Sequence, residues 1–200
     1  MYKKQMTVQR ILCILSLVAS ALVFVYSLGI MTDLFDMLYK MMPDPSNIDV
    51  DRIGGGARIY YDMQGFNHQL LWAGIILILV SVVLFLTNTH SRRKYYIGNF
   101  FATGLTAVSN LIVAIWAHGK IAAYKATYLA TINFDELQHQ LERRKVGDLF
   151  TKSTFWFDIH TLVFVITIAV SCLLVVNAIW KVKLMKEEQD LIKAGKAVSA

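Results

Sequence analysis

Residues 159–180 have the sequence IHTLVFVITIAVSCLLVVNAIW, which contains no Asp, Glu, Lys or Arg. A helix of this length rises about 33 Å, enough to cross a hydrocarbon core of ~30 Å. Three further uncharged runs occur at 11–31, 70–88 and 97–117. Together the four runs cover 83 of the 200 residues, so all 34 charged residues lie in the other 117. This segregation predicts an all-α integral membrane protein with four spans, at about 8–31, 69–89, 97–118 and 158–180.

The composition points to the same class of protein. Hydrophobic residues make up 56% of the chain and charged residues 17%, whereas a soluble domain is about 45–50% apolar and about 25% charged. These values exclude a disordered chain and argue against an ordinary soluble enzyme. We therefore predict that residues 1–200 form a single membrane domain, in which the four spans pack as a four-helix bundle.

The distribution of charge predicts the orientation of the spans. The segments 1–10, 89–96 and 181–200 contain 11 Lys or Arg and 3 acidic residues, whereas 32–69 and 118–158 contain 9 and 11. Basic segments stay on the cytoplasmic side. Both termini, a loop at 90–96 and a tail at 181–200 are therefore expected inside, and two loops at 32–68 and 119–157 outside.

The two outer loops are expected to differ in structure. In the first, the helical pattern continues beyond Met31 until Pro43 ends it, and a small β-hairpin follows over 48–63, with Gly54, Gly55 and Gly56 as a break. The second loop is expected to be helical. There Asn133 caps a helix, and Glu136 stands three residues later.

Small and weakly polar residues recur at helical spacing in each span. Such residues let helix backbones approach closely in lipid, and their hydroxyl and amide groups hydrogen-bond between helices. The pattern predicts helix–helix contacts at Ser20, Gly74, Ser81, Ala102, Asn110 and Ser171.

Imidazole and carboxyl groups collect at the predicted outer ends of the spans. The residues of this candidate outer pocket are His68, His118, His160, Asp158 and Asp62. Such groups could ligate Zn²⁺, and two histidines from different spans could ligate haem. No His or Cys motif of metal-binding spacing supports this, so no cofactor is predicted and the metal question stays open. The competing interpretation treats these residues as independent, solvated span ends.

Nothing in the sequence names a reaction. The favoured hypothesis is a non-catalytic accessory or assembly subunit that uses its extracytoplasmic loops for recognition. The alternatives are a small homo-oligomeric channel or exporter component, and a membrane redox or metal protein using the outer histidines. The expected partners are the lipid bilayer and either another membrane protein or further copies of the chain, with no nucleic acid. Because the outer loops contain neither cysteine nor an Asn-x-Ser/Thr motif, a bacterial plasma (inner) membrane is favoured.

Overall fold

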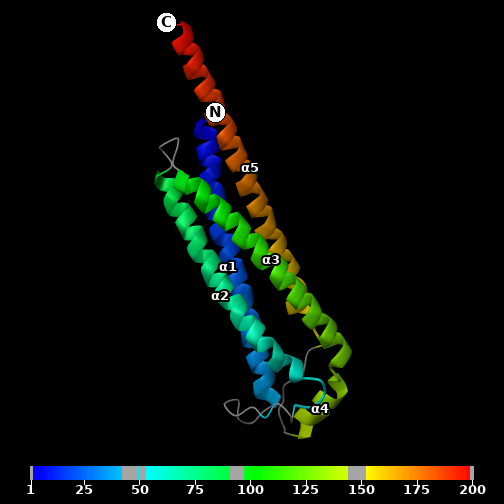
Figure 1. The fold of residues 1–200 in the computed structure, drawn as a ribbon. Helices are drawn as coiled ribbons and strands as arrows, with labels where there is room; N and C mark the ends of the chain where they lie inside the picture. The colour runs from blue at the N-terminus through cyan, green and yellow to red at the C-terminus, as the bar shows by residue number, and fades with distance from the viewer. Residues whose placement is uncertain (1, 42–48, 50–52, 91–96, 144–151, 199–200) are drawn as a thin grey trace. The chain divides into compact units, whose positions relative to one another are not determined.

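The computed structural model describes residues 2–41, 49, 53–90, 97–143 and 152–198 (Figure 1). Within these ranges the chain forms five helices and no strand. They are α1 (Tyr2–Met41), α2 (Arg58–His90), α3 (Ile97–Thr131), α4 (Phe134–Arg143) and α5 (Phe155–Val198). Four of them, α1, α2, α3 and α5, are long and apolar enough to cross a membrane, as predicted.

The long helices extend beyond the predicted spans, at both ends in α1, α2 and α5 and at the C-terminal end in α3. Helix α1 continues past Met31 with its buried side chains Leu34, Met37 and Leu38 on one face. An ion pair of 2.9 Å between Lys40 Nζ and Asp36 Oδ2 lies on the same stretch. The described part of α1 ends at Met41, and the predicted terminator, Pro43, lies outside the described residues. The tail at 181–198 continues α5 as one helix.

The prediction of a β-hairpin at 48–63 is wrong for the second arm, which lies within the described residues and is helical from Arg58. The glycines form a turn, in which Ala57 N donates to Gly54 O (3.2 Å), and α2 begins at Arg58. Residues 48 and 50–52 lie outside the described part. Buried side chains follow helical rather than alternating spacing here, at Ile59, Tyr60, Met63 and Phe66. Tertiary burial of that stripe outweighs the local β propensity of Ile and Tyr.

The glycine turn is held by close backbone contacts that exclude a side chain. Gly55 and Gly56 have φ values of 62° and 74°, the left-handed region that favours glycine. A Cβ on Gly56 would overlap the carbonyl oxygen of Thr131. Asn133 N also donates to Gly55 O (3.0 Å). The turn before α2 is therefore attached to the connection between α3 and α4.

The contacts divide the chain into two compact units. Unit 1 comprises Met1–Ala21, Ile75–Ala114 and Val165–Ala200, and unit 2 comprises Leu22–Gly74 and Ile115–Phe164. A core cluster of unit 1 contains Leu12, Cys13, Ala19, Leu84, Ala102, Val170 and Leu174. Each unit thus draws on α1, α2, α3 and α5, and unit 2 also contains α4.

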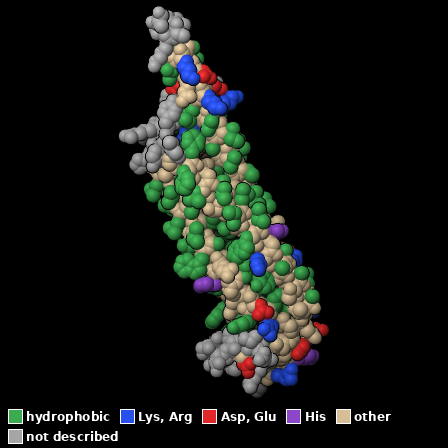
Figure 2. All heavy atoms as spheres, viewed as in Figure 1, with side chains coloured by type: hydrophobic (Ala, Val, Ile, Leu, Met, Phe, Trp, Pro, Cys, Tyr) green, Lys and Arg blue, Asp and Glu red, His purple; other side chains and the backbone are tan. Residues whose placement is uncertain are grey.

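The outward faces of the long helices are strongly apolar. Hydrophobic side chains are spread over them in Figure 2, and Phe101 is 72% exposed and Leu79 59% exposed. The buried faces contain polar residues instead, with Ser16, Ser20 and Asn110 fully enclosed. Buried polar groups together with exposed large apolar ones are the reverse of the usual soluble pattern.

Candidate functional site

The structure brings together two histidines of the predicted outer pocket. His118 lies on α3 and His160 on α5, with 3.0 Å between His118 Nδ1 and His160 Nε2. Their ring centroids are 5.1 Å apart, and His160 is buried with its edge against Phe164. One imidazole must donate this hydrogen bond and the other accept it. The pair therefore joins two helices of unit 2.

The remaining residues of the predicted pocket have other partners. His68 is exposed on α2 and its Nε2 accepts from Trp72 Nε1 (3.1 Å). Asp62 Oδ1 lies 3.7 Å from Arg58 Nε on the same helix, α2.

Asp158 forms a separate contact within unit 2. Its carboxylate accepts from Lys125 Nζ (2.5 Å) and from Thr154 Oγ1 (2.6 Å). Within the described ranges, no three His, Cys, Asp or Glu side chains are grouped in a way that could hold a metal ion. The five residues thus form four separate contacts, and His160 is the only one of the five that is buried.

The small residues of the predicted helix contacts lie on buried faces. In unit 1, Ser81 Oγ lies 2.9 Å from Ser20 Oγ and 3.0 Å from Ser16 Oγ, and Asn110 Nδ2 donates to Ser171 Oγ (3.1 Å). Buried Ala102 belongs to the core cluster. In unit 2, a Cβ added to Gly74 would lie 2.9 Å from Phe24 Cα, so α1 and α2 approach closely there.

Sequence reasoning missed a buried polar cluster in unit 1. Its members are Gln5, Gln9, Asn99, Asn177 and Lys181. Lys181 Nζ donates to Asn99 Oδ1 (3.3 Å) and lies 4.8 Å from the centroid of the Phe100 ring. Amides near the ends of three apolar runs were the available signal, but their separation in sequence gave no reason to group them.

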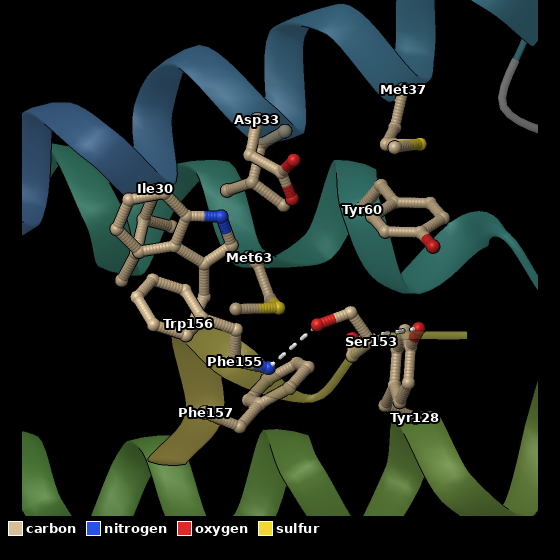
Figure 3. Close-up of a pocket in the computed structure, with 11 residues that line it drawn as sticks. Ile30, Asp33, Met37, Tyr60, Met63, Tyr128, Ser153, Phe155, Trp156 and Phe157 are labelled. Atoms are coloured by element: carbon tan, nitrogen blue, oxygen red, sulfur yellow. Dashed lines mark hydrogen bonds between the residues drawn. The ribbon is translucent and has the colours of Figure 1, made fainter. Parts of the chain in front are cut away.

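Sequence reasoning also missed a cavity of about 300 Å³ in unit 2 (Figure 3). Its volume is at the small end of the range for ligand sites. Five aromatic side chains line it, from Tyr60, Tyr128, Phe155, Trp156 and Phe157. The other lining side chains belong to Ile30, Asp33, Leu34, Met37, Met63 and Ser153. Among the described residues of this largely aromatic and apolar lining, Asp33 is thus the one charged residue.

Local contacts hold the aromatic lining in place. Tyr26 Oη donates to the carbonyl oxygen of Trp156 (2.7 Å). A Cβ on Gly29 would overlap the Trp156 ring, so the indole packs directly against the α1 backbone. The Tyr128 ring lies 5.0 Å from Phe157 and 6.3 Å from Tyr60, centroid to centroid. These contacts connect α1, α2, α3 and the start of α5 around the cavity.

No family model, no curated protein and no solved structure matches this chain. The basis for a function is therefore the arrangement of the chain's own residues.

Proposed function

We propose that this chain is a non-catalytic accessory or assembly subunit of a bacterial plasma membrane. Four transmembrane helices pack as a bundle, both termini face the cytoplasm, and the segments 32–68 and 119–157 face outward. The outer region recognises a partner membrane protein.

Membrane insertion is supported by the distribution of polarity over the helices. Large apolar side chains such as Phe101, Ile115 and Leu79 face outward from α3 and α2. An apolar surface this extensive is a liability in water and marks a membrane or protein interaction surface. The enclosed hydroxyl and amide groups contribute hydrogen bonds between helices, as expected where no hydrophobic effect drives helices together.

The observation that carries the recognition role is the construction of α4. Leu137 and Leu141 are buried on one side of this ten-residue helix. The other side exposes Asp135, Glu136, His139, Glu142 and Arg143. The helix is capped at Asn133, whose Oδ1 accepts from Glu136 N (3.2 Å) as the sequence predicts. A short helix of this kind is not required for spanning a bilayer. Because α4 is packed on one side and presents charged side chains on the other, it favours a role in recognising a partner protein.

The pairing of ionisable groups supports a non-catalytic role. Asp158 is engaged by Lys125, Asp62 lies beside Arg58, and His118 is hydrogen-bonded to His160. A nucleophilic mechanism needs an activated nucleophile next to a base that a third group orients. Two of these contacts, Lys125 with Asp158 and His118 with His160, join α3 to α5, and the third lies within α2.

Photo-crosslinking in native membranes tests this proposal. A photoreactive amino acid is placed at His139, on the exposed side of α4, and in a matched variant at Leu191, exposed on α5. We expect a discrete crosslinked protein from position 139 and none from position 191. Crosslinks confined to position 191, or none at either position, would overturn the recognition role of α4.

A further inference from the structure

The cavity of unit 2 has the composition of a site for an organic cation. The described residues of its lining contribute one carboxylate and five aromatic rings, and none of them is Lys, Arg or His. The face of an aromatic ring attracts cations, and aromatic cages are the recurrent means by which proteins recognise quaternary ammonium groups. In Figure 3, Asp33 extends from α1 toward the cavity with Trp156 beside it. Negative charge and aromatic surface are thus present in one cavity.

Contacts with the rest of unit 2 hold the indole of Trp156 in place. Trp156 is seated against Gly29, and its carbonyl oxygen is held by Tyr26 Oη. A preorganised site loses little conformational freedom when it binds.

The described lining consists mainly of aromatic and apolar side chains, which favours a quaternary ammonium over a primary one. Tyr128 Oη donates to Ser153 O (3.4 Å), and Ser153 Oγ accepts from Phe155 N (3.2 Å). A primary ammonium has three N–H donors to satisfy, and each donor left without an acceptor is costly once buried. A quaternary ammonium has no donor.

We propose that this cavity binds a small quaternary ammonium group, with Asp33 as its counter-ion and the rings of Tyr60, Tyr128 and Trp156 as its cage. A volume of about 300 Å³ admits a group of the size of choline. The source is either a free quaternary amine or the headgroup of a phosphatidylcholine lipid. The proposed ligand is one for the outer region of the protein. The assignment rests on the proposed function in one respect only, namely which side of the membrane the cavity faces.

Calorimetric titration of the full-length protein in dodecyl maltoside tests the assignment. We expect choline to bind saturably, and its uncharged isostere 3,3-dimethyl-1-butanol to bind about tenfold or more weakly, because it lacks the charge that the cage attracts. This comparison uses the wild-type chain and does not depend on any variant folding. Equal binding of the two compounds, or no binding of choline, would overturn the proposal.

Two variants and a control locate the binding. Asp33→Asn keeps the side-chain shape and is expected to weaken choline binding by about tenfold or more, and Gly29→Ala to weaken it by displacing the indole. Asp62→Asn removes an exposed carboxylate of the same unit that does not line the cavity, and should bind as wild type. Unchanged binding by Asp33→Asn would place the ligand elsewhere and overturn the assignment.

Nanodiscs distinguish the two sources of the ammonium group. Choline binding that persists in phosphatidylglycerol discs but is blocked in phosphatidylcholine discs supports the site and identifies a lipid headgroup as its occupant. Binding that persists in both supports the site and identifies a free amine. Failure of crosslinking at His139 would remove the proposed partner and leave the cavity result standing, so the two proposals fail separately.

Discussion

The contact between His118 and His160 joins two polar side chains that are distant in the sequence. The two residues are 42 positions apart, and their ring nitrogens lie 3.0 Å from each other. A net gain of about 1 kcal/mol is typical of a hydrogen bond, and leaving one partner unsatisfied costs more. The pair is therefore expected to stabilise the contact between α3 and α5.

Alanine replacement of these histidines should reveal that coupling. His118→Ala and His160→Ala are each expected to lower the temperature of thermal unfolding in detergent. The double variant should lose less than the sum, because the same hydrogen bond is broken in both. His139→Ala, at an exposed position on α4, should unfold like wild type. Strictly additive losses would show that the two rings do not stabilise each other.

The glycine turn permits a second prediction with a matched control. Gly56→Ala places a Cβ against the Thr131 carbonyl at a φ of 74°, so we expect a marked loss of thermal stability. Gly65 lies within α2, and a Cβ there meets nothing within 4 Å. Gly65→Ala is therefore expected to be neutral or to stabilise by up to about 1 kcal/mol, through helix propensity. Equal stability of the two variants would contradict the close approach at Gly56.

At the level of the helix, burial decides between patterns that local sequence leaves ambiguous. The stretch at 58–63 contains residues of high β propensity, yet Ile59, Tyr60 and Met63 are buried as one face of α2. Helix α4 behaves differently, because Asn133 starts it locally and its apolar residues repeat at helical spacing. Helix α4 was therefore predictable from its own residues, whereas the start of α2 was not.

The close approach of α1 and α2 is the basis of a packing prediction. Gly74→Leu would force the two helices apart, since even a Cβ would lie 2.9 Å from Phe24 Cα. We expect a clear drop in the unfolding temperature. Gly104→Leu on α3, where a Cβ meets nothing within 4 Å, and Leu79→Val at an exposed position should change it little. Similar losses in all three variants would remove the case for a specific contact at Gly74.

Removal of the α4 cap should loosen that helix selectively. Asn133→Ala deletes the side-chain acceptor for Glu136 N, a loss that typically costs about 1 kcal/mol. Amide hydrogen exchange should accelerate over 134–143 while the amides of α3 keep their protection. Unchanged exchange in α4 would mean that burial of Leu137 and Leu141, and not the cap, sustains the helix.

The orientation of the chain in the membrane is a property of the whole molecule. Single cysteines at Gln138 and Leu191, in a background of Cys13→Ala and Cys172→Ala, test the proposed orientation in intact cells. An impermeant thiol reagent should label position 138 directly and position 191 only after permeabilisation, because basic segments remain cytoplasmic. Labelling of position 191 in intact cells would overturn the proposal that both termini face inward.

Four long apolar helices follow from the sequence because hydrophobic length is a local property. A run such as 159–180 must be helical in lipid, where every backbone N–H and C=O needs a partner within its own segment. The apolar continuation of α1 and the cap of α4 were predictable for the same reason, since they depend on residues three or four positions apart. The orientation predicted from charge remains to be tested.

Contacts between distant residues emerge only in the folded chain. His118 is hydrogen-bonded to His160, whereas His68 is hydrogen-bonded to Trp72. Such outcomes depend on the rotation of each helix about its axis, and the packing of all the helices sets this rotation. The cavity around Asp33 likewise gathers Tyr60, Tyr128 and Trp156 from separate helices. Periodicity shows which residues share a face of one helix, whereas the partner of that face is settled by the fit of side chains across the interface.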